Sequence, residues 1–440
     1  MTSTQDLKTS IYRRSKMKKV IAIILAAVML FSVAGAIAEA PVKISFLCSA
    51  GGSGRSFEGG LNQFIEKYGD KIDVSIDMIA LASLPEQLMT QFISGKAFYD
   101  AIGVNSVWQA NMYNYLLPLN AYIEKDGLDL AALYGDMSAY TYEGNIIGLP
   151  IRTGTDVLQY RKDFLEEKGV AVPTDMQSLL EAARALTSGP EDNRDVYGFA
   201  YMAQDPFFCT NMTADFLFSH GIYFLNEDMT APNEDLKSDA ATAIFDVIYK
   251  LYAEKLMPNP MAWTYDDSIV AFQEGKIAMT MDDFMRAPTV EKEGTSARGN
   301  MGYAAFTPGQ TGSSAPRARG GWWILSIDKN TENPEASWEF IKFMCSLETQ
   351  TYMAYEWSNG PSILTLLDDP TFNEVNHGAS AAKVNFGELG VRDPVSIDAR
   401  EPLANAIQDC MHKLFLGELA PSEVGPAMYD MFTEILADYQ

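Results

Sequence analysis

Residues 142–173 read YEGNIIGLPIRTGTDVLQYRKDFLEEKGVAVP, and this stretch decides the architecture that we expect. Its segment Gly148-Leu149-Pro150-Ile151 is too short and too interrupted for a helix. Because proline fixes φ and removes a backbone donor, the segment predicts extended chain that passes between two bodies. Residues 157–160 then favour a buried strand, and Arg161-Lys162-Asp163 opens a short amphipathic helix that ends at Gly169.

A second block, residues 267–286, reads DSIVAFQEGKIAMTMDDFMR. It predicts a helix that ends at Gly275, a strand over residues 276–281 and a loop, Asp282-Asp283-Phe284. Phe284 would supply an aromatic face. The two carboxylates could accept hydrogen bonds from hydroxyl groups, so this loop is a candidate binding loop.

A third block, residues 320–350, reads GGWWILSIDKNTENPEASWEFIKFMCSLETQ. It predicts a strand over residues 323–327 and a helix that starts at Asn333-Pro334. Because side chains alternate across a strand, one of Trp322 and Trp323 faces the core and the other the opposite face. We assign Trp322 to the face where the two bodies meet.

Together the three blocks resemble family 1 extracellular solute-binding proteins, the group that includes maltose-binding protein. That family follows its Gly-Pro crossing with L-x-Y-x-K-D, where this chain has Arg at position 161 in place of the common Asn. It also carries F-x-x-G-K-A-A-M, matched here by residues 272–279, and a Gly-Gly strand followed by a helix that begins at Pro. The resemblance covers residues 41–440.

The resemblance implies an α/β fold of the two-lobe periplasmic-binding-protein type (type II, maltose-binding-protein-like) with a hinge. The N-terminal lobe would comprise residues 39–150 and 308–370, and the C-terminal lobe residues 151–307 and 371–440. The chain would cross between the lobes near Pro150, near Thr307-Pro308 and around Asp369.

The resemblance also implies a ligand bound between the lobes, a sugar or oligosaccharide, and a hinge-closed form that the permease subunits of an ABC importer recognise. It implies a monomer and no cofactor. Aromatic faces together with carboxylates and Asn side chains suit such a ligand, because pyranose C–H faces stack on rings and hydroxyls need directional partners. The ligand-binding residues that we predict are Arg55, Asp100, Asn105, Trp108, Asp205, Phe207, Asp282, Asp283, Phe284, Trp322, Trp323 and Arg400.

Several of these residues follow strands that we expect in the first lobe. Arg55 ends the Gly-rich stretch that follows the strand at residues 42–46. This Gly-rich stretch lacks both phosphate-binding spacings, G-x-x-x-x-G-K-[ST] and G-x-G-x-x-G. Asp100 matches the aspartate of a family G-x-x-x-D element. Asn105 and Trp108 follow the strand at residues 101–104, and Trp108 either contacts ligand or packs against its own lobe.

The remaining candidates belong to the second lobe. Asp205-Pro206-Phe207 takes the position of a sugar-contacting triplet in relatives, after a strand that we expect at residues 197–200. Arg400 begins the helix that lines the site in relatives, although it could equally pair with a carboxylate inside the lobe. Thr174 and Gln177 have the spacing of a capping box, which predicts that an amphipathic helix begins near Met176.

The first 38 residues predict an export signal that is removed. Five basic residues between Arg13 and Lys19 precede a continuous apolar run over residues 20–31, and Ala36-Ile37-Ala38 offers a cleavage site. We expect cleavage after Ala38, with Met1 or Met17 as the start. Cys48 follows Leu47 in a lipobox-like pair, but it lies far beyond the apolar run and is interpreted as a strand residue.

Composition narrows the partners. Residues 39–440 contain 27 Lys+Arg and 57 Asp+Glu, a formal charge of −30, which argues against nucleic acid and anionic membranes. The four cysteines lack metal-ligand spacing, and in a core of this size we expect free buried thiols.

Two other functions compete with sugar binding. A secreted glycosidase would need a placed carboxylate pair, but adjacent strand residues such as Asp282 and Asp283 point apart, and the G-x-S-x-G and H-E-x-x-H motifs are absent. A binding protein for a non-sugar ligand is the other alternative. Asp282-Asp283 would favour a cation such as a polyamine, whereas Arg55 and Arg400 would favour an anion.

Overall fold

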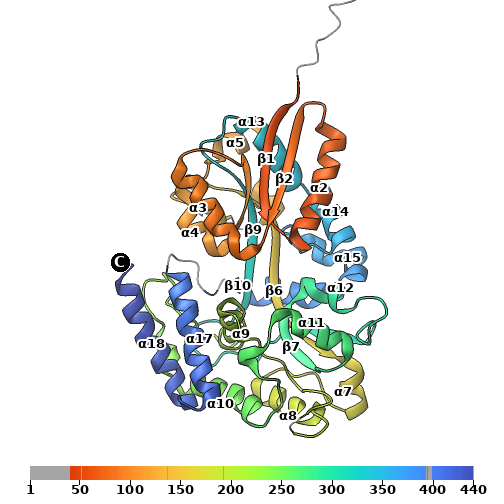
Figure 1. Cartoon of the computed structure of the whole chain (residues 1–440), viewed down its shortest axis with the longest axis vertical. Helices are drawn as coiled ribbons and strands as arrows, with labels where there is room; N and C mark the ends of the chain where they lie inside the picture. The colour runs from red at the N-terminus through yellow and green to blue at the C-terminus, as the bar shows by residue number, and fades with distance from the viewer. Residues whose placement is uncertain are drawn as a thin grey trace, which may run out of the picture.

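The computed structural model describes residues 40–439 except 51, 136, 192, 393 and 395–398, so the expected signal peptide lies outside the described residues. The chain forms two lobes joined by long strands, as Figure 1 shows, with β1, β2 and α2 in one lobe and β7, α10 and α17 in the other. Each lobe has its own large cluster of buried side chains. This confirms the expected two-lobe α/β fold.

One sheet runs through both lobes, in the order β2-β1-β3-β9-β6-β7, with β8 added on β6 and β10 on β9. β1 is parallel to β2 and β3, whereas β9 is antiparallel to β3 and to β6. Its strands are β1 (Val42–Ser49), β2 (Ile72–Ile79), β3 (Ala101–Asn105), β6 (Leu149–Arg161), β7 (Met279–Asp283), β8 (Met301–Ala304), β9 (Ala318–Ile327) and β10 (Val391–Arg392). A separate hairpin pairs β4 (Thr141–Tyr142) with β5 (Asn145–Ile146).

The expected crossing near Pro150 is the start of β6, a single strand of 13 residues. Its first part pairs with β9 in one lobe, and its last part pairs with β7 and β8 in the other. The pairing with β9 is irregular between Pro150 and Arg152, where the proline cannot donate to the ladder. The predicted strand at residues 157–160 is the far end of this strand. The helix that follows, α7 (Lys162–Lys168), ends at Gly169 with φ of 66°, as expected.

The N-terminal lobe packs its helices on both sides of β1, β2 and β3. Phe64 on α2 contacts Phe340 on α13 edge to face, with ring centroids 5.3 Å apart, and Phe46 on β1 contacts the same ring at 5.2 Å. The helices of this lobe are α2 (Gly52–Tyr68), α3 (Leu84–Ser94), α4 (Gln109–Met112), α5 (Asn120–Asp126), α6 (Leu130–Tyr134), α13 (Pro334–Met344) and α14 (Leu347–Trp357).

The C-terminal lobe surrounds α9 (Pro206–Phe218), which is buried along most of its length. Around it lie α8 (Met176–Leu186), α10 (Asp239–Ala253), α11 (Tyr265–Glu274), α12 (Ala287–Val290), α17 (Arg400–Leu416) and α18 (Pro421–Ala437). Residues 197–200, expected as a strand, make only an isolated bridge between Tyr197 and Ile277. The expected capping box is shifted by one residue, because Asp175 and Ser178, not Thr174 and Gln177, cap α8.

A third cluster of buried side chains lies where the lobes join. It combines Val157 on β6 and Phe284 after β7 with Ala354, Phe372 and other residues of α14, α15 (Pro370–Val375) and α16 (Ala379–Val384). We call it the hinge cluster.

Backbone hydrogen bonds indicate where the chain passes between the lobes for the second time. Thr311 and Arg317 donate backbone hydrogen bonds to His220 and Phe218 in the C-terminal lobe. We infer from them that the chain passes between the lobes along β9 itself, beyond the expected position at Thr307-Pro308. All four cysteines are buried and unpaired, as expected.

Candidate binding site

A cavity of about 270 Å³ lies between the two lobes. The ends of β1 and β3 line it from the N-terminal lobe, and α9, α11 and β7 line it from the C-terminal lobe. The two strands that run between the lobes, β6 and β9, also line the cavity through alternate residues. These residues are Arg152, Gly154 and Asp156 on β6, and Arg319, Gly321 and Trp323 on β9. Because strand side chains alternate with a period of two, each set shares one face of its strand.

A buried ion pair joins the two crossing strands. Arg319 donates from Nε to Asp156 Oδ2 at 2.6 Å, and a second guanidinium nitrogen donates to Oδ1 of the same carboxylate. Asp215 on α9 approaches Arg319 at 3.8 Å. Burial opposes the charge on Arg319, but attraction by Asp156 and then Asp215 raises its pKa above the ordinary value. Bidentate arginine–carboxylate pairs are strong and specify geometry, so this pair fixes β6 against β9.

Three further carboxyl groups around the pair are held in an unfavourable environment. Burial, followed by repulsion from Asp156, raises the pKa of Asp215 and of Asp282 well above the usual range. The same two causes raise the pKa of Asp283 to about 6. Asp283 also accepts a hydrogen bond from the backbone of Met285 at 3.0 Å, which caps the turn η7 (Phe284–Arg286). A protonated carboxyl group can donate as well as accept, so Asp282 and Asp283, which line the cavity, can pair with ligand hydroxyls in either sense.

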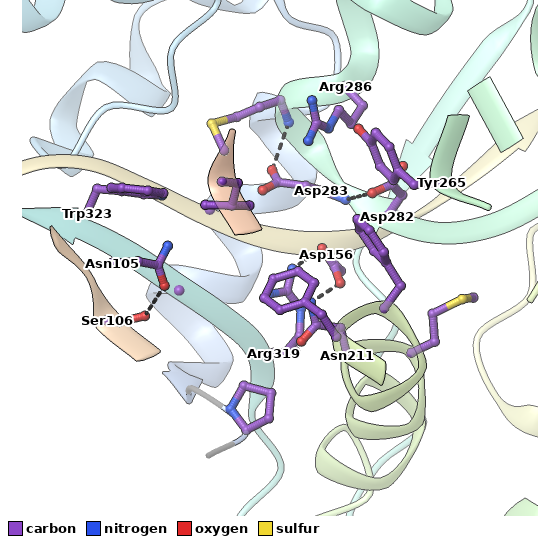
Figure 2. A pocket seen from close by; sticks show the side chains of 18 of the residues that line it. Asn105, Ser106, Asp156, Asn211, Tyr265, Asp282, Asp283, Arg286, Arg319 and Trp323 are labelled. Carbon is purple, nitrogen blue, oxygen red and sulfur yellow. Dashed lines mark hydrogen bonds and ion pairs between the residues drawn. The ribbon is translucent and has the colours of Figure 1, made fainter. Parts of the chain in front are cut away.

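The cavity also holds cationic side chains stacked on aromatic rings. The guanidinium of Arg286 lies 4.4 Å from the ring centroid of Tyr265, and that of Arg400 lies 5.5 Å from Phe207. Burial, followed by repulsion from Arg152, lowers the pKa of Arg286 to about 10. Figure 2 shows Tyr265 and Arg286 on one side of the cavity and Trp323, Asn105 and Ser106 on the other.

Half of the predicted site residues line this cavity. They are Asn105, Phe207, Asp282, Asp283, Trp323 and Arg400. They come from both lobes, as the resemblance implies, and they place aromatic faces beside directional polar groups.

Trp322, Trp108 and Phe284 do not line the cavity. Trp322 points to the other face of β9, where its ring meets Tyr140 edge to face at 5.8 Å, so the assignment of the pair is reversed. Trp108 packs edge to face on Trp323 at 5.6 Å and supports that ring from behind. Phe284 is fully buried in the hinge cluster.

Arg55, Asp100 and Asp205 also lie outside the lining. Arg55 is exposed on α2, because the expected Gly-rich loop is already helical from Gly52. Asp100 stands at the beginning of β3, opposite to the cavity end, and accepts hydrogen bonds from Ser45 and Thr331. Asp205 caps α9 by accepting from the backbone of Phe207 at 2.8 Å.

Sequence reasoning missed Arg152, Asp156 and Arg319, although the first two lie in the stretch that decides the fold. The signal was present as charges inside two long strands that are mainly apolar or small, where an unpaired charge is costly. Asn211, Tyr265 and Arg286 were missed because only the packing of α9, α11 and η7 brings them to the cavity.

Neither a metal centre nor a membrane-spanning helix is found in the described part of the chain. No three His, Cys, Asp or Glu side chains there are grouped so that they could hold a metal ion. No helix among the described residues combines the length and apolar character that crossing a membrane requires.

Comparison with known proteins gives one family and many related structures. A family profile described as "Bacterial extracellular solute-binding protein" matches residues 61–379. A curated relative, a "Probable ABC transporter-binding protein" of Deinococcus radiodurans, is 23% identical over 74% of this chain and 78% of its own length.

Solved structures share the whole fold. Maltose-bound MalE3 of T. maritima superposes with a TM-score of 0.76 at 24% identity and covers 91% of this chain and 100% of its own. The GacH receptor of Streptomyces glaucescens, solved unliganded and with acarbose, gives a TM-score of 0.75 at 20% identity and the same coverage. Lmo0181 of Listeria monocytogenes, solved with cycloalternan, gives 0.73 at 18% identity, covering 90% and 99%.

Proposed function

The chain belongs to the family of bacterial extracellular solute-binding proteins, and on this basis we propose that it binds a carbohydrate between its lobes and delivers it to an ABC-type importer. The observation that carries the proposal is the composition of the interlobe cavity. Trp323 and Asn105 line the cavity from one lobe and Phe207, Tyr265 and Asn211 from the other, and Asp156, Asp282 and Asp283 also line it. Rings that stack on pyranose faces and polar groups that pair with hydroxyls are what a sugar requires.

The relatives support the same class of ligand. Structures similar to this chain over nine-tenths of its length were solved with maltose, with acarbose and with cycloalternan. The cavity of about 270 Å³ lies just below the usual range of about 300–1,000 Å³ for small-molecule sites, which favours one or two sugar rings over a long oligosaccharide.

The proposed role does not include catalysis. Asp282 and Asp283 are neighbours on one strand end, and Asp156 is engaged by Arg319, so these three carboxylates do not form a pair poised across a common substrate bond. Sustained hydrolysis of chromogenic glycosides, lost in an Asp282→Asn variant, would contradict this part of the proposal.

The proposed role requires export, and we propose cleavage after Ala38 with Glu39 as the mature N-terminus. The intact mass of the protein recovered outside cells that express the full gene tests this cleavage site. A mass that includes a diacylglyceryl adduct on Cys48 would instead identify a lipoprotein.

A thermal-shift screen of monosaccharides and disaccharides against residues 39–440 tests the function. At a hundredfold excess over its dissociation constant, a bound sugar stabilises the protein by about 2.7 kcal/mol. Binding also changes tryptophan emission, because Trp323 lines the cavity. If polyamines or amino acids raise the melting temperature and no carbohydrate does, the proposed ligand class is wrong.

Two neighbouring tryptophans give a matched pair of variants for the screen. Trp323→Ala is expected to weaken sugar binding by tenfold or more, while Trp322→Ala, on the opposite face of the same strand, changes it by less than threefold. The reverse order would place the site on the other side of β9.

A further inference from the structure

Arg286 is a partly buried cation in an unusual position. It lines the cavity at the end of η7, and the cation stacks on Tyr265. Its Nε is cut off from water without a hydrogen-bond partner, and no carboxylate of the described residues lies within ion-pair distance of its guanidinium. The hydroxyl of Tyr265 is likewise buried and unpaired. Buried polar groups are nearly always paired, so unpaired donors on two stacked side chains call for a partner that the described part of the chain does not supply.

The charged groups around Arg286 favour an anionic partner over a cationic one. Arg152 repels Arg286 and, with burial, disfavours its charge. Two of the carboxylates that line the cavity are already engaged, because Asp156 holds Arg319 and Asp283 caps η7 and attracts Arg152. Burial, followed by repulsion from Asp156, raises the pKa of Asp282 well above its usual range, which reduces the negative charge that this group would place against an anion. A cationic ligand, in contrast, would have to lie beside Arg152 and Arg286.

A carboxylate meets these requirements better than a hydroxyl does. It brings a full negative charge and two coplanar oxygens, which match the planar fork of a guanidinium, whereas a hydroxyl brings one acceptor and no charge. The unpaired hydroxyl of Tyr265, on the ring that stacks against the guanidinium, is a further donor.

We propose that the natural ligand is an acidic carbohydrate, a sugar that carries a uronic-acid carboxylate, and that Arg286 and Tyr265 bind this carboxylate. The proposal rests on the proposed carbohydrate function and specifies its substrate class. Trp323, on the opposite side of the cavity in Figure 2, would then face a ring of the same ligand, and Asn105 its hydroxyls.

The most direct test compares one sugar in two charge states. A uronic-acid disaccharide and its methyl ester differ only in the carboxylate, and calorimetric titration of residues 39–440 measures both. We expect the acid to bind at least tenfold more tightly than the ester. Equal or tighter binding of the ester, or of the neutral disaccharide, overturns the acidic-sugar inference and leaves the carbohydrate function intact.

Two further ligands separate the remaining outcomes. A sugar phosphate that binds where the uronate does not would show that the anion is a phosphate, and would overturn the assignment of a carboxylate. Failure of every neutral, acidic and phosphorylated carbohydrate to bind would overturn the proposed function itself.

Variants assign the contact to its residues. Arg286→Gln keeps amide donors but removes the charge, and it is expected to weaken binding of the acid about 10- to 100-fold while leaving the ester within twofold. Tyr265→Phe keeps the stacked ring and is expected to weaken the acid about 3- to 10-fold. Arg298→Gln, an exposed arginine of the same lobe, controls for net charge and should have no effect. If Arg286→Gln weakens binding of the acid and of the ester to the same extent, Arg286 does not bind the carboxylate and only supports the packing of the site.

Discussion

At the scale of single residues, the contact between Arg319 and Asp156 does most to define the site. Neither residue stands out in the sequence as part of a pair, because 163 positions separate them. Both side chains are almost completely buried, at 10% and 6% exposure. A lone charge at such a place is costly, so either residue by itself predicted a partner. Which residue that partner is depends on the register of β6 against β9, and no local sequence pattern encodes this register.

Removing Arg319 should destabilise the protein strongly. Arg319→Met leaves Asp156 unpaired beside Asp215 and Asp282, and we expect a loss of about 3–5 kcal/mol in the free energy of unfolding, measured with urea at pH 7.5. The double variant Arg319→Met, Asp156→Leu removes both charges and should recover most of this loss. A single variant within 1 kcal/mol of the parent would show that the pair does not hold the crossing strands.

Asp283 should make stability depend on pH. Its pKa of about 6 in the folded protein lies above the value of 3.8 for an unstrained aspartate, so the folded state binds the proton more tightly. The stabilisation from the protonated form is therefore complete below about pH 4 and is lost as the pH rises through about 6. Asp283→Asn keeps an acceptor for the backbone of Met285 and should stabilise the protein by about 1–2 kcal/mol at pH 7.5.

The gain from Asp283→Asn should shrink toward zero near pH 4, which urea unfolding at a series of pH values can follow. Asp430→Asn on the exposed face of α18 serves as the control and should show no such dependence. A gain from Asp283→Asn that stays constant between pH 4 and 8 would contradict the assignment.

At the scale of elements, the pattern of apolar residues predicted most strands and helices. It did not always identify which of two adjacent residues caps a helix or faces the cavity. The residues Thr174-Asp175-Met176-Gln177-Ser178 offer two overlapping capping boxes, and the backbone uses the second. On β9 the alternation of residues correctly separated Trp322 from Trp323. Which of the two faces meets the cavity depended on the strand's neighbours, and Arg319 and Gly321 mark that face only once the pairing with β6 is known.

The capping of α8 can be tested by one pair of substitutions. Asp175 accepts from the backbone of Ser178 at 2.8 Å, so Asp175→Ala should cost about 1 kcal/mol of folding stability. Thr174→Ala, at the position that the sequence favoured, should cost less than about 0.3 kcal/mol, because surface changes away from such contacts have small effects. Chemical denaturation measures both, and a larger effect of Thr174→Ala would show that this residue caps the helix.

At the scale of the whole molecule, the three sequence blocks were sufficient for the fold because each contains a complete strand–helix junction with its Gly or Pro boundary. They were not sufficient for the site. Of the residues that line the cavity, Asn211 comes from the middle of a buried helix and Tyr265 from the first turn of another, and nothing near them marks a strand end. Their position follows from how the two lobes enclose the cavity.

At this scale, the proposed ligand bridges the two lobes and so favours their closure, since it binds both sides only in the closed form. Distance measurement between the lobes tests this directly. Lys96, directly after α3, and Glu434, on α18, are exposed, so both can be replaced by cysteine for fluorescent labels. The helices α3 and α18 belong to different lobes and both lie at the left of the molecule in Figure 1. The native thiols are buried, and burial raises the pKa of Cys48 and Cys410 to about 12, so they should resist labelling.

The decisive measurement is energy transfer between these labels during titration with a sugar that calorimetry has shown to bind. We expect transfer efficiency to change with the same midpoint as binding, and the change to disappear together with binding in Trp323→Ala. Saturating the site without any change in transfer, while calorimetry still reports binding, would contradict closure of the lobes around the ligand.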